Sequence, residues 1–309
     1  MRTTTQALAR WSRDAARDAL PLAQRVLATA AQGAEAAWRT FIGQQVEARL
    51  GRVPVHAGPG GVDPFGLDLE WGKYVLALVA LLHRKYFRTE VHGIEHVPAG
   101  RVLLIANHSG QVPVDAAMIG AAMFFDAEPP RILRSMVEKW SQTLPFVSVL
   151  FTRMGQVVGV PENARRLLEY GEAVLVFPEG ARGISKPFRQ RYQLTEFGLG
   201  FMRLALETET PIVPVAVIGA EEQYINLTNV GALAKALGMP TFPIIPQILV
   251  PGLQLPLPTK YRIYFGEPMR FYGDPDEDDS IIEEKVWVVK ATVQSMINRG
   301  LKERRGIFT

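Results

Sequence analysis

Two short polar segments of the sequence each follow a run of apolar residues, and their residue types suit acid–base chemistry. The first segment holds a histidine and, seven positions later, an aspartate, His108 and Asp115. An aspartate can hold the proton of one imidazole nitrogen and leave the other nitrogen free to remove a proton from a hydroxyl. The pair therefore predicts a general base with its orienting carboxylate. The alternative is structural, with His108 in a turn and Asp115 capping a helix.

The second polar segment, Phe177–Gly183, contains groups that suit an anionic ligand. Gly180 permits a close approach of the backbone to a ligand. Arg182 and the nearby Lys186 can neutralise a phosphate, the arginine through two parallel hydrogen bonds. An internal ion pair between Glu179 and Arg182 that closes the loop is the competing interpretation.

Composition excludes several classes of protein. The 309 residues are 48% hydrophobic and 21% charged, which indicates a folded chain with a large core. The chain has no cysteine, which excludes disulfides, thiolate metal sites and a cysteine nucleophile. The net charge of +3 is too small to indicate nucleic-acid binding, and we expect no nucleic-acid partner.

The charge is unevenly distributed along the chain. Residues 131–191 contain ten Lys or Arg and five Asp or Glu. This basic stretch favours an anionic ligand or an anionic surface, with an ordinary solvated face as the alternative.

Apolar runs alternate with helical patterns along most of the chain, and this alternation predicts the fold. It is typical of an α/β protein with a mostly parallel central sheet flanked by helices on both faces. Both polar segments then lie at the carboxyl ends of strands, where α/β proteins place their active sites. The expected strands are Val102–Ala106, Arg131–Val137, Ala173–Phe177, Pro211–Ile218 and Tyr261–Phe265. The expected helices are Ala116–Phe125, Trp140–Phe151, Pro161–Glu169, Leu194–Glu207 and Ile281–Leu301.

A segment rich in glycine and proline, Gly51–Gly66, predicts a linker. Residues 1–50 are rich in Ala, Arg and Gln and have a loosely helical apolar spacing. We therefore expect an N-terminal helical extension with its linker over residues 1–66, followed by the main domain over residues 67–309.

Two apolar segments bear on membrane contact. Tyr74–Leu82 has nine apolar residues, too few to span a bilayer, so it fits an interfacial or a buried helix. Ala236–Thr259 has 24 residues without a charge but six prolines, which exclude a regular helix. It reads as an apolar loop, either packed on the domain or in contact with a membrane. We expect no transmembrane helix and no signal peptide. We also expect Tyr74–Arg88, which adds the basic and aromatic residues after the first run, to lie on one surface with Ala236–Thr259.

Two further groups of ionisable residues are not expected to form functional sites. The sequence His92-Gly-Ile-Glu-His96 matches an inverted zinc-protease motif, but Gly93 and Pro98 favour a turn, so we expect no metal site. The adjacent carboxylates of Glu221 and Glu222 are predicted to be a solvated pair.

Taken in order, four blocks resemble the glycerophospholipid acyltransferase family of the lysophosphatidate (1-acylglycerol-3-phosphate) type. The blocks are Asn107-His108 with Asp115, Phe151-Thr152-Arg153, Phe177-Pro178-Glu179-Gly180 with Arg182, and Ile212-Val213-Pro214-Val215. The resemblance covers residues 85–270 and does not extend to residues 1–66. One departure is the spacing between His108 and Asp115, which has six intervening residues where the family usually has four.

The resemblance implies a membrane-associated O-acyltransferase of phospholipid biosynthesis. A fatty acyl group would pass from acyl-CoA or acyl carrier protein, as co-substrate without any cofactor, to a glycerolipid hydroxyl such as that of lysophosphatidate. His108 would be the general base with Asp115 beside it. The residues implied in acceptor binding are Asn107, Arg153, Glu179, Gly180, Arg182 and Lys186.

Three further expectations follow from the resemblance. The implied location is peripheral or monotopic on the cytoplasmic side of a membrane. A neutral-lipid acyltransferase, using mono- or diacylglycerol, is one alternative, because divergent relatives share the wider His–Asp spacing. A catalytically silent lipid-binding protein with this fold is the other.

Overall fold

The computed structural model describes residues 43–54, 61–109, 112–139, 141, 144, 146–231, 242–245, 247 and 255–309. The predicted helices of residues 1–42 and most of the apolar segment Ala236–Thr259 lie outside these ranges. The chain divides into two compact units, Met1–Ala48 and Arg49–Thr309. The helix α2 (Gly43–Leu50) crosses the boundary between the two units. The sheet and the candidate site belong to the second unit. The predicted linker and domain boundary at Gly51–Gly66 stay a prediction.

The centre of the second unit is a seven-stranded sheet with the order β1-β9-β6-β2-β5-β3-β4. Strand pairing is parallel throughout except between β6 and β9, which are antiparallel. The prediction of a mostly parallel sheet is confirmed. The strands are β1 (Glu90–His92), β2 (Val102–Ala106), β3 (Leu133–Val137), β4 (Val157–Val158), β5 (Ala173–Val176), β6 (Ile212–Ile218) and β9 (Arg262–Phe265). A separate antiparallel pair is formed by β7 (Thr228–Asn229) and β8 (Pro243–Ile244).

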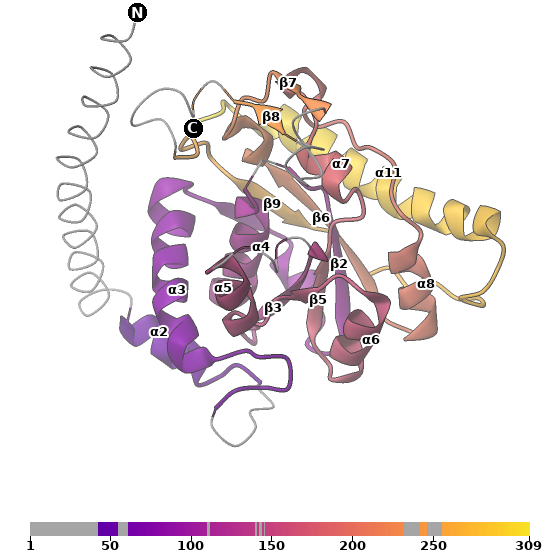
Figure 1. Ribbon diagram of the computed structural model, residues 1–309, viewed down its shortest axis with the longest axis horizontal. Helices are drawn as coiled ribbons and strands as arrows, with labels where there is room; N and C mark the ends of the chain where they lie inside the picture. The colour runs from indigo at the N-terminus through magenta and orange to yellow at the C-terminus, as the bar shows by residue number, and fades with distance from the viewer. Residues whose placement is uncertain are drawn as a thin grey trace, which may run out of the picture. The chain divides into compact units, whose positions relative to one another are not determined.

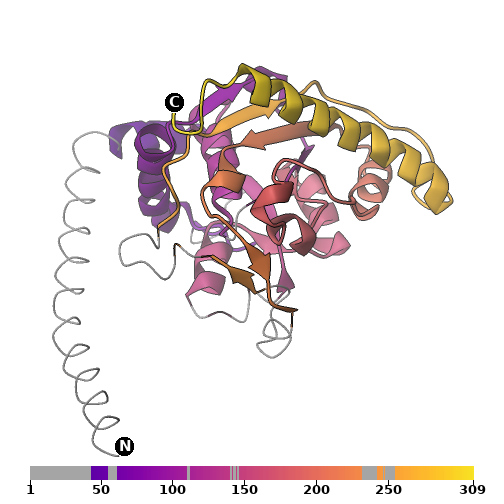
Figure 2. The same ribbon diagram turned by 90° about the horizontal axis from the view of Figure 1, so that it is seen from above.

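Helices cover both faces of this sheet, as Figure 1 shows, with α3 and α4 on one side and α6, α8 and α11 on the other. The long helix α11 lies along the sheet beside β6 (Figure 2). The helices of this unit are α3 (Leu69–Leu81), α4 (Val114–Phe125), α5 (Val147–Arg153), α6 (Pro161–Glu169), α7 (Ala181–Ile184), α8 (Gly200–Glu207) and α11 (Asp279–Glu303). Shorter turns are the π-helix Leu82–Tyr86 and the 3₁₀ turns Ile94–His96, Phe188–Gln190 and Ala220–Glu222.

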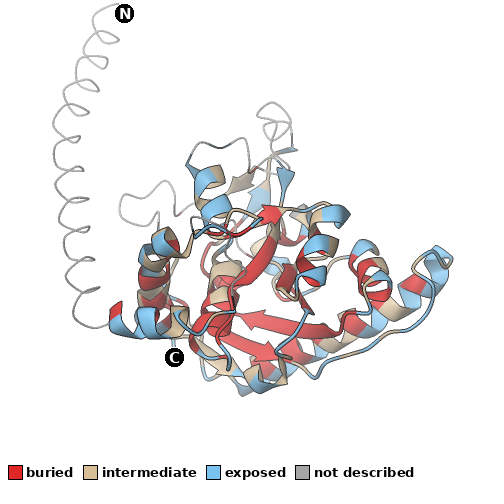
Figure 3. Ribbon diagram, turned by 90° about the horizontal axis from the view of Figure 1, so that it is seen from below, coloured by how far each residue is buried: buried red, intermediate tan, exposed pale blue. Residues whose placement is uncertain are grey.

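The alternation of side chains along β2 explains why its apolar run is unbroken. Leu104 packs into the core under α4, whereas Leu103 and Ile105 pack into the core under α6 and α8. Because both faces of a central strand are covered, every position must be apolar. All five residues of β2 are buried, and Figure 3 shows the same burial along the neighbouring strands.

Most of the predicted elements are found at or near their predicted positions, but two helices differ. The helix expected over Leu194–Glu207 begins only at Gly200, because residues 194–198 run as a loop tied to the segment after β5. The helix expected over Trp140–Phe151 is described over Val147–Arg153, and Trp140 lies outside the described residues. The zinc-like motif His92–His96 spans a strand end and a 3₁₀ turn, and the Nδ1 of His96 lies 3.0 Å from the carbonyl oxygen of Phe265.

The segments Tyr74–Arg88 and Ala236–Thr259, which were considered for membrane contact, touch each other where both are described. The Tyr86 hydroxyl donates to the carbonyl of Pro256 at 2.5 Å, and a guanidinium nitrogen of Arg88 donates to the carbonyl of Pro258 at 2.8 Å. Helix α3 buries Leu76 and Ala80 but leaves Leu78 55% exposed. Within the part of the chain that the structure describes, no helix combines the length and hydrophobicity needed to cross a bilayer.

Candidate active site

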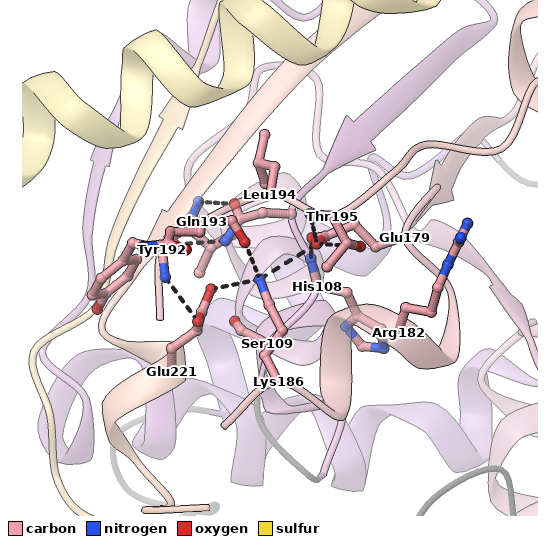
Figure 4. Close-up of polar contacts among 12 residues, drawn as sticks. His108, Ser109, Glu179, Arg182, Lys186, Tyr192, Gln193, Leu194, Thr195 and Glu221 are labelled. Carbon is pink, nitrogen blue, oxygen red and sulfur yellow. Dashed lines mark hydrogen bonds and ion pairs between the residues drawn. The ribbon is translucent and has the colours of Figure 1, made fainter. Parts of the chain in front are cut away.

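Parallel strands bring three segments of the chain to one edge of the sheet. Strands β5, β2 and β6 are neighbours with parallel registers, so their carboxyl ends lie side by side. His108 follows β2, Phe177–Gly183 follows β5, and Gly219–Glu222 follows β6. Figure 4 shows side chains from these three segments converging. The prediction that the two polar segments meet at this edge is confirmed.

The imidazole of His108 and the carboxylate of Asp115 meet despite the long spacing between them. The Nδ1 of His108 lies 2.8 Å from the Oδ2 of Asp115, whose side chain is fully buried. The same oxygen accepts the backbone N–H of Ser109 at 2.8 Å, and the other accepts the backbone N–H of Ala116. Helix α4 begins at Val114, so Asp115 sits in its first turn, where a negative charge is favoured.

The carboxylate of Asp115 defines which nitrogen of His108 can act on a substrate. A carboxylate accepts a hydrogen bond, so the Nδ1 facing it carries the proton and the Nε2 has a free lone pair. Among the described residues, Nε2 has no hydrogen-bond partner. The ring is also held flat against Phe177, with ring centroids 4.0 Å apart and planes 17° apart. This stacking role of Phe177 was not predicted, because no local pattern shows which ring will face another.

Glu179 is buried and ties three segments together. Its Oε1 accepts the backbone N–H of His108 at 3.1 Å. Its Oε2 accepts both the backbone N–H and the hydroxyl of Thr195, at 2.8 and 3.0 Å. Both carboxylate oxygens are therefore engaged by the protein. The binding of an acceptor head group by Glu179 stays a prediction, and the geometry gives this residue a role in holding the His108 main chain.

Lys186 is likewise engaged by the protein rather than by solvent. Its ammonium nitrogen lies 3.1 Å from the carbonyl oxygen of Gln193, 3.1 Å from the Oε1 of Glu221 and 3.4 Å from the Oε2 of Glu179. An ammonium group has three hydrogens, and three acceptors surround it here (Figure 4). Its predicted contact with an acceptor phosphate is untested.

Arg182 is the exposed cation of this edge. It lies in the short helix α7, and its guanidinium donates to the Oε2 of Glu196 at 2.9 Å. Both partners are largely exposed, at 57% and 84% of their side chains, so the pair is weak and open to exchange. The alternative interpretation, an internal ion pair between Glu179 and Arg182, is not observed: Arg182 pairs with Glu196, and Lys186 lies beside Glu179.

The remaining predicted binding residues occupy three different settings. Asn107 is buried, and its amide exchanges two hydrogen bonds with the backbone of Val217, at 3.0 and 2.8 Å. Gly180 has a φ of 55° before α7, a conformation that favours glycine. Arg153 is exposed at the end of α5, with its guanidinium 5.5 Å from the ring centroid of Trp71. For all three, substrate binding stays a prediction.

The prediction that Glu221 and Glu222 are solvated is wrong, because both carboxylates are buried. They diverge, as expected of adjacent residues: Glu221 faces Lys186, and Glu222 accepts two hydrogen bonds from Arg304 at 2.6 and 2.8 Å. Burial raises the pKa of Glu221 to about 7, although Lys186 and the backbone N–H of Tyr192 act in the opposite direction. Sequence alone could not reveal this burial, which depends on the segments that cover the end of β6.

Gly183 allows the site to pack closely, which leads to a testable prediction. A Cβ at this position would lie 3.0 Å from the Cβ atoms of both Glu179 and His108. Gly183→Ala is therefore expected to displace His108 and to lower the rate of the reaction at this site about 10-fold or more, because small misplacements of a reacting group are costly. The measurement is the steady-state rate with saturating substrates. Gly200→Ala, where a Cβ meets nothing within 4 Å, is the matched control. Equal rates for both variants would contradict the close packing.

The site and its sheet define a class of protein: an α/β protein with a histidine–aspartate pair at the carboxyl ends of parallel strands. The family profile described as Acyltransferase matches residues 88–218, which include His108, Asp115 and Phe177–Gly183. An uncharacterized protein of Mycobacterium tuberculosis is 38% identical over 259 residues, which cover 81% of this chain and 72% of that protein. The chain therefore belongs to the acyltransferase family, and it is an enzyme of the glycerolipid acyltransferase type.

Two further proteins resemble this chain. A mouse protein named DGAT1/2-independent enzyme synthesizing storage lipids is 24% identical over 210 residues, covering 68% of this chain and 60% of the mouse protein. The crystal structure of the 1-acyl-sn-glycerophosphate acyltransferase PlsC from Thermotoga maritima superposes with a TM-score of 0.51 at 20% identity. The superposition covers 88% of this chain and 93% of the PlsC chain. This structural similarity supports the fold described above.

Proposed function

We propose that this protein is a membrane-associated acyltransferase that moves a fatty acyl group from an acyl thioester to a glycerolipid hydroxyl, with His108 as the general base. The observation that carries the proposal is the contact of 2.8 Å between the Nδ1 of His108 and the Oδ2 of Asp115, which leaves Nε2 as the reacting nitrogen. A buried carboxylate held by two backbone N–H groups is well suited to fix that tautomer.

The proposed reaction is a direct transfer. The Nε2 of His108 takes the proton of the acceptor hydroxyl as its oxygen attacks the thioester carbonyl carbon. The tetrahedral intermediate then collapses: the carbon–sulfur bond breaks, the ester forms, and the thiolate leaves with the proton held by His108. Asp115 stabilises the imidazolium between these two steps. The donor is acyl-CoA or acyl carrier protein, both of which present the same thioester.

The first candidate acceptor is a lysophospholipid such as lysophosphatidate. Support comes from the basic character of residues 131–191 and from Arg182, whose exposed guanidinium can exchange Glu196 for a phosphate. Both groups can accept two parallel hydrogen bonds from a guanidinium, and phosphate is favoured over a carboxylate here because it carries more charge.

A neutral acceptor, mono- or diacylglycerol, is the second candidate. The observation in its favour is that the ammonium of Lys186 already has three acceptors within the protein, so one cation expected for the phosphate is committed elsewhere. The name of the mouse relative, an enzyme synthesizing storage lipids, points the same way.

The proposed site of action is the cytoplasmic surface of a membrane. The exposed side chain of Leu78 and the basic residues after α3 suit an interfacial contact, with apolar groups in the acyl layer and cations near anionic head groups.

The experiment is an acyl-transfer assay with labelled acyl-CoA or acyl carrier protein and acceptors presented in anionic liposomes. We expect turnover with at least one of lysophosphatidate, monoacylglycerol and diacylglycerol, and co-flotation of the protein with the liposomes. The ratio of kcat/KM values for phosphorylated and unphosphorylated acceptors decides between the two candidates. Flotation without turnover on any acceptor and donor would overturn the proposal in favour of a silent lipid-binding protein.

A further inference from the structure

A buried ionic cluster contacts the main chain of His108 through Glu179. We define the Lys186 cluster as Lys186 and Glu179, which follow β5, and Glu221, which follows β6 (Figure 4). The exposed fractions of these side chains are 4%, 0% and 6%. One ammonium is thus enclosed with two carboxylates where water cannot compensate their charges.

The geometry of the cluster argues against a direct contact between Lys186 and substrate. Two hydrogen bonds at 3.1 Å, to Gln193 and Glu221, and an ion pair at 3.4 Å with Glu179 hold the ammonium inside the protein. A phosphate could bind Lys186 only by displacing one of these partners. Displacing Glu179 or Glu221 would leave a buried carboxylate without its cation, which is strongly unfavourable.

The same geometry links Lys186 to the base through Glu179. The Oε2 of Glu179 faces Lys186 and accepts from Thr195, while its Oε1 accepts the backbone N–H of His108. The backbone of His108 is thus attached to a carboxylate whose position Lys186 restrains. Glu221 in turn restrains Lys186 from the end of β6 and also accepts the backbone N–H of Tyr192 at 2.9 Å.

We infer that Lys186 and Glu221 are positioning residues of the acyltransferase: they fix Glu179, and Glu179 holds the main chain of His108 where its ring can reach the acceptor hydroxyl. The inference rests on the proposed role of His108. It replaces the predicted contact of Lys186 with the acceptor head group by an indirect role.

The ionisation of Glu221 supports this role and gives a readout that is independent of activity. Its pKa is raised to about 7 by burial first, with Glu179 adding to the rise and Lys186 opposing it. The charged or titratable groups that face it are therefore Lys186 and Glu179, with the backbone N–H of Tyr192 as a further donor. The folded state thus favours the protonated form, so this contribution to stability is complete below about pH 4.5 and is lost as the pH rises through about 7.

The test compares Lys186→Met and Glu221→Gln with the wild type, using a phosphorylated and an unphosphorylated acceptor. We expect kcat to fall by about 10- to 10²-fold for both acceptors while each KM changes by less than about 3-fold, because the base is misplaced and no binding contact is lost. A rise in KM for the phosphorylated acceptor alone would show that Lys186 binds the head group. An unchanged kcat in both variants would also overturn the inference.

The control variant is Glu172→Gln, which removes a carboxylate from an ion pair with Arg134, a residue of β3. It is expected to lower thermal stability without changing kcat. Should Lys186→Met fail to fold, Glu221→Gln still tests the inference, since the amide matches the carboxylate in size.

The dependence of Tm on pH separates this inference from the proposed function. Between about pH 4.5 and 7, the Tm of the wild type is expected to fall. Glu221→Gln is expected to flatten that fall, whereas Glu172→Gln keeps it. If the wild type transfers no acyl group, the proposed function fails whatever the Tm values show. If the wild type does transfer acyl groups, and Glu221→Gln changes neither kcat nor the dependence of Tm on pH, only the positioning role fails.

Discussion

His108→Ala is expected to lower the rate of acyl transfer by about 10²–10⁴, the range typical of losing a positioned general base. The acceptor hydroxyl would then lose its proton acceptor as it attacks the thioester. The reaction would rely on water and on the binding of the two substrates. The measurement is kcat/KM with acyl-CoA and the best acceptor, for wild type and variant at equal protein concentration.

Asp115→Asn is the companion variant for this prediction. The asparagine amide cannot hold the Nδ1 proton as the carboxylate does, so the ring would lose its tautomer and orientation. Because the two residues act as a unit, the double variant should be little worse than His108→Ala alone. A His108→Ala protein that keeps most of its activity, with an unchanged melting profile, would exclude His108 as the base.

Arg134→Met is expected to cause the largest loss of stability, about 3–5 kcal/mol in the free energy of unfolding. The guanidinium of Arg134 is 1% exposed and pairs with Asp63, 3% exposed, and with Glu172 at 2.9 Å. Removing it leaves the buried carboxylate of Asp63 without its cation and takes one cation from Glu172, whose side chain is 15% exposed. The change can be read from the midpoint and slope of urea unfolding.

Two added substitutions separate the loss of the ion pair from the loss of packing in Arg134→Met. Adding Asp63→Asn and Glu172→Gln to Arg134→Met removes the stranded charges and should recover a large part of the lost free energy. Activity should change little, because Arg134 lies on β3, away from the strand ends that carry His108 and Glu179. A loss below about 1 kcal/mol for Arg134→Met alone would contradict the burial of an essential ion pair.

Local patterns in the sequence were sufficient for the central strands and for helix α6. The unbroken run Val102–Ala106 predicted β2, because only a strand covered on both faces requires every residue to be apolar. Pro161 fits the first turn of a helix, where its missing N–H costs nothing, and α6 begins there. The predicted start of α8 was wrong by six residues, because the backbone N–H of Thr195 donates to Glu179 and the residues around it form a loop.

The sequence by itself determined the family, the order of strands and helices along the chain, and the residue types at the reacting edge, because these depend on local periodicity and on short motifs. The tertiary structure decided which charges are buried and which groups they meet. The sequence predicted that Lys186 binds an acceptor phosphate and that Glu221 is solvated, whereas the structure pairs the two side chains in a buried position. Burial depends on segments far apart in the chain, and the free energy of a charge depends on that burial, so no local pattern could assign their roles.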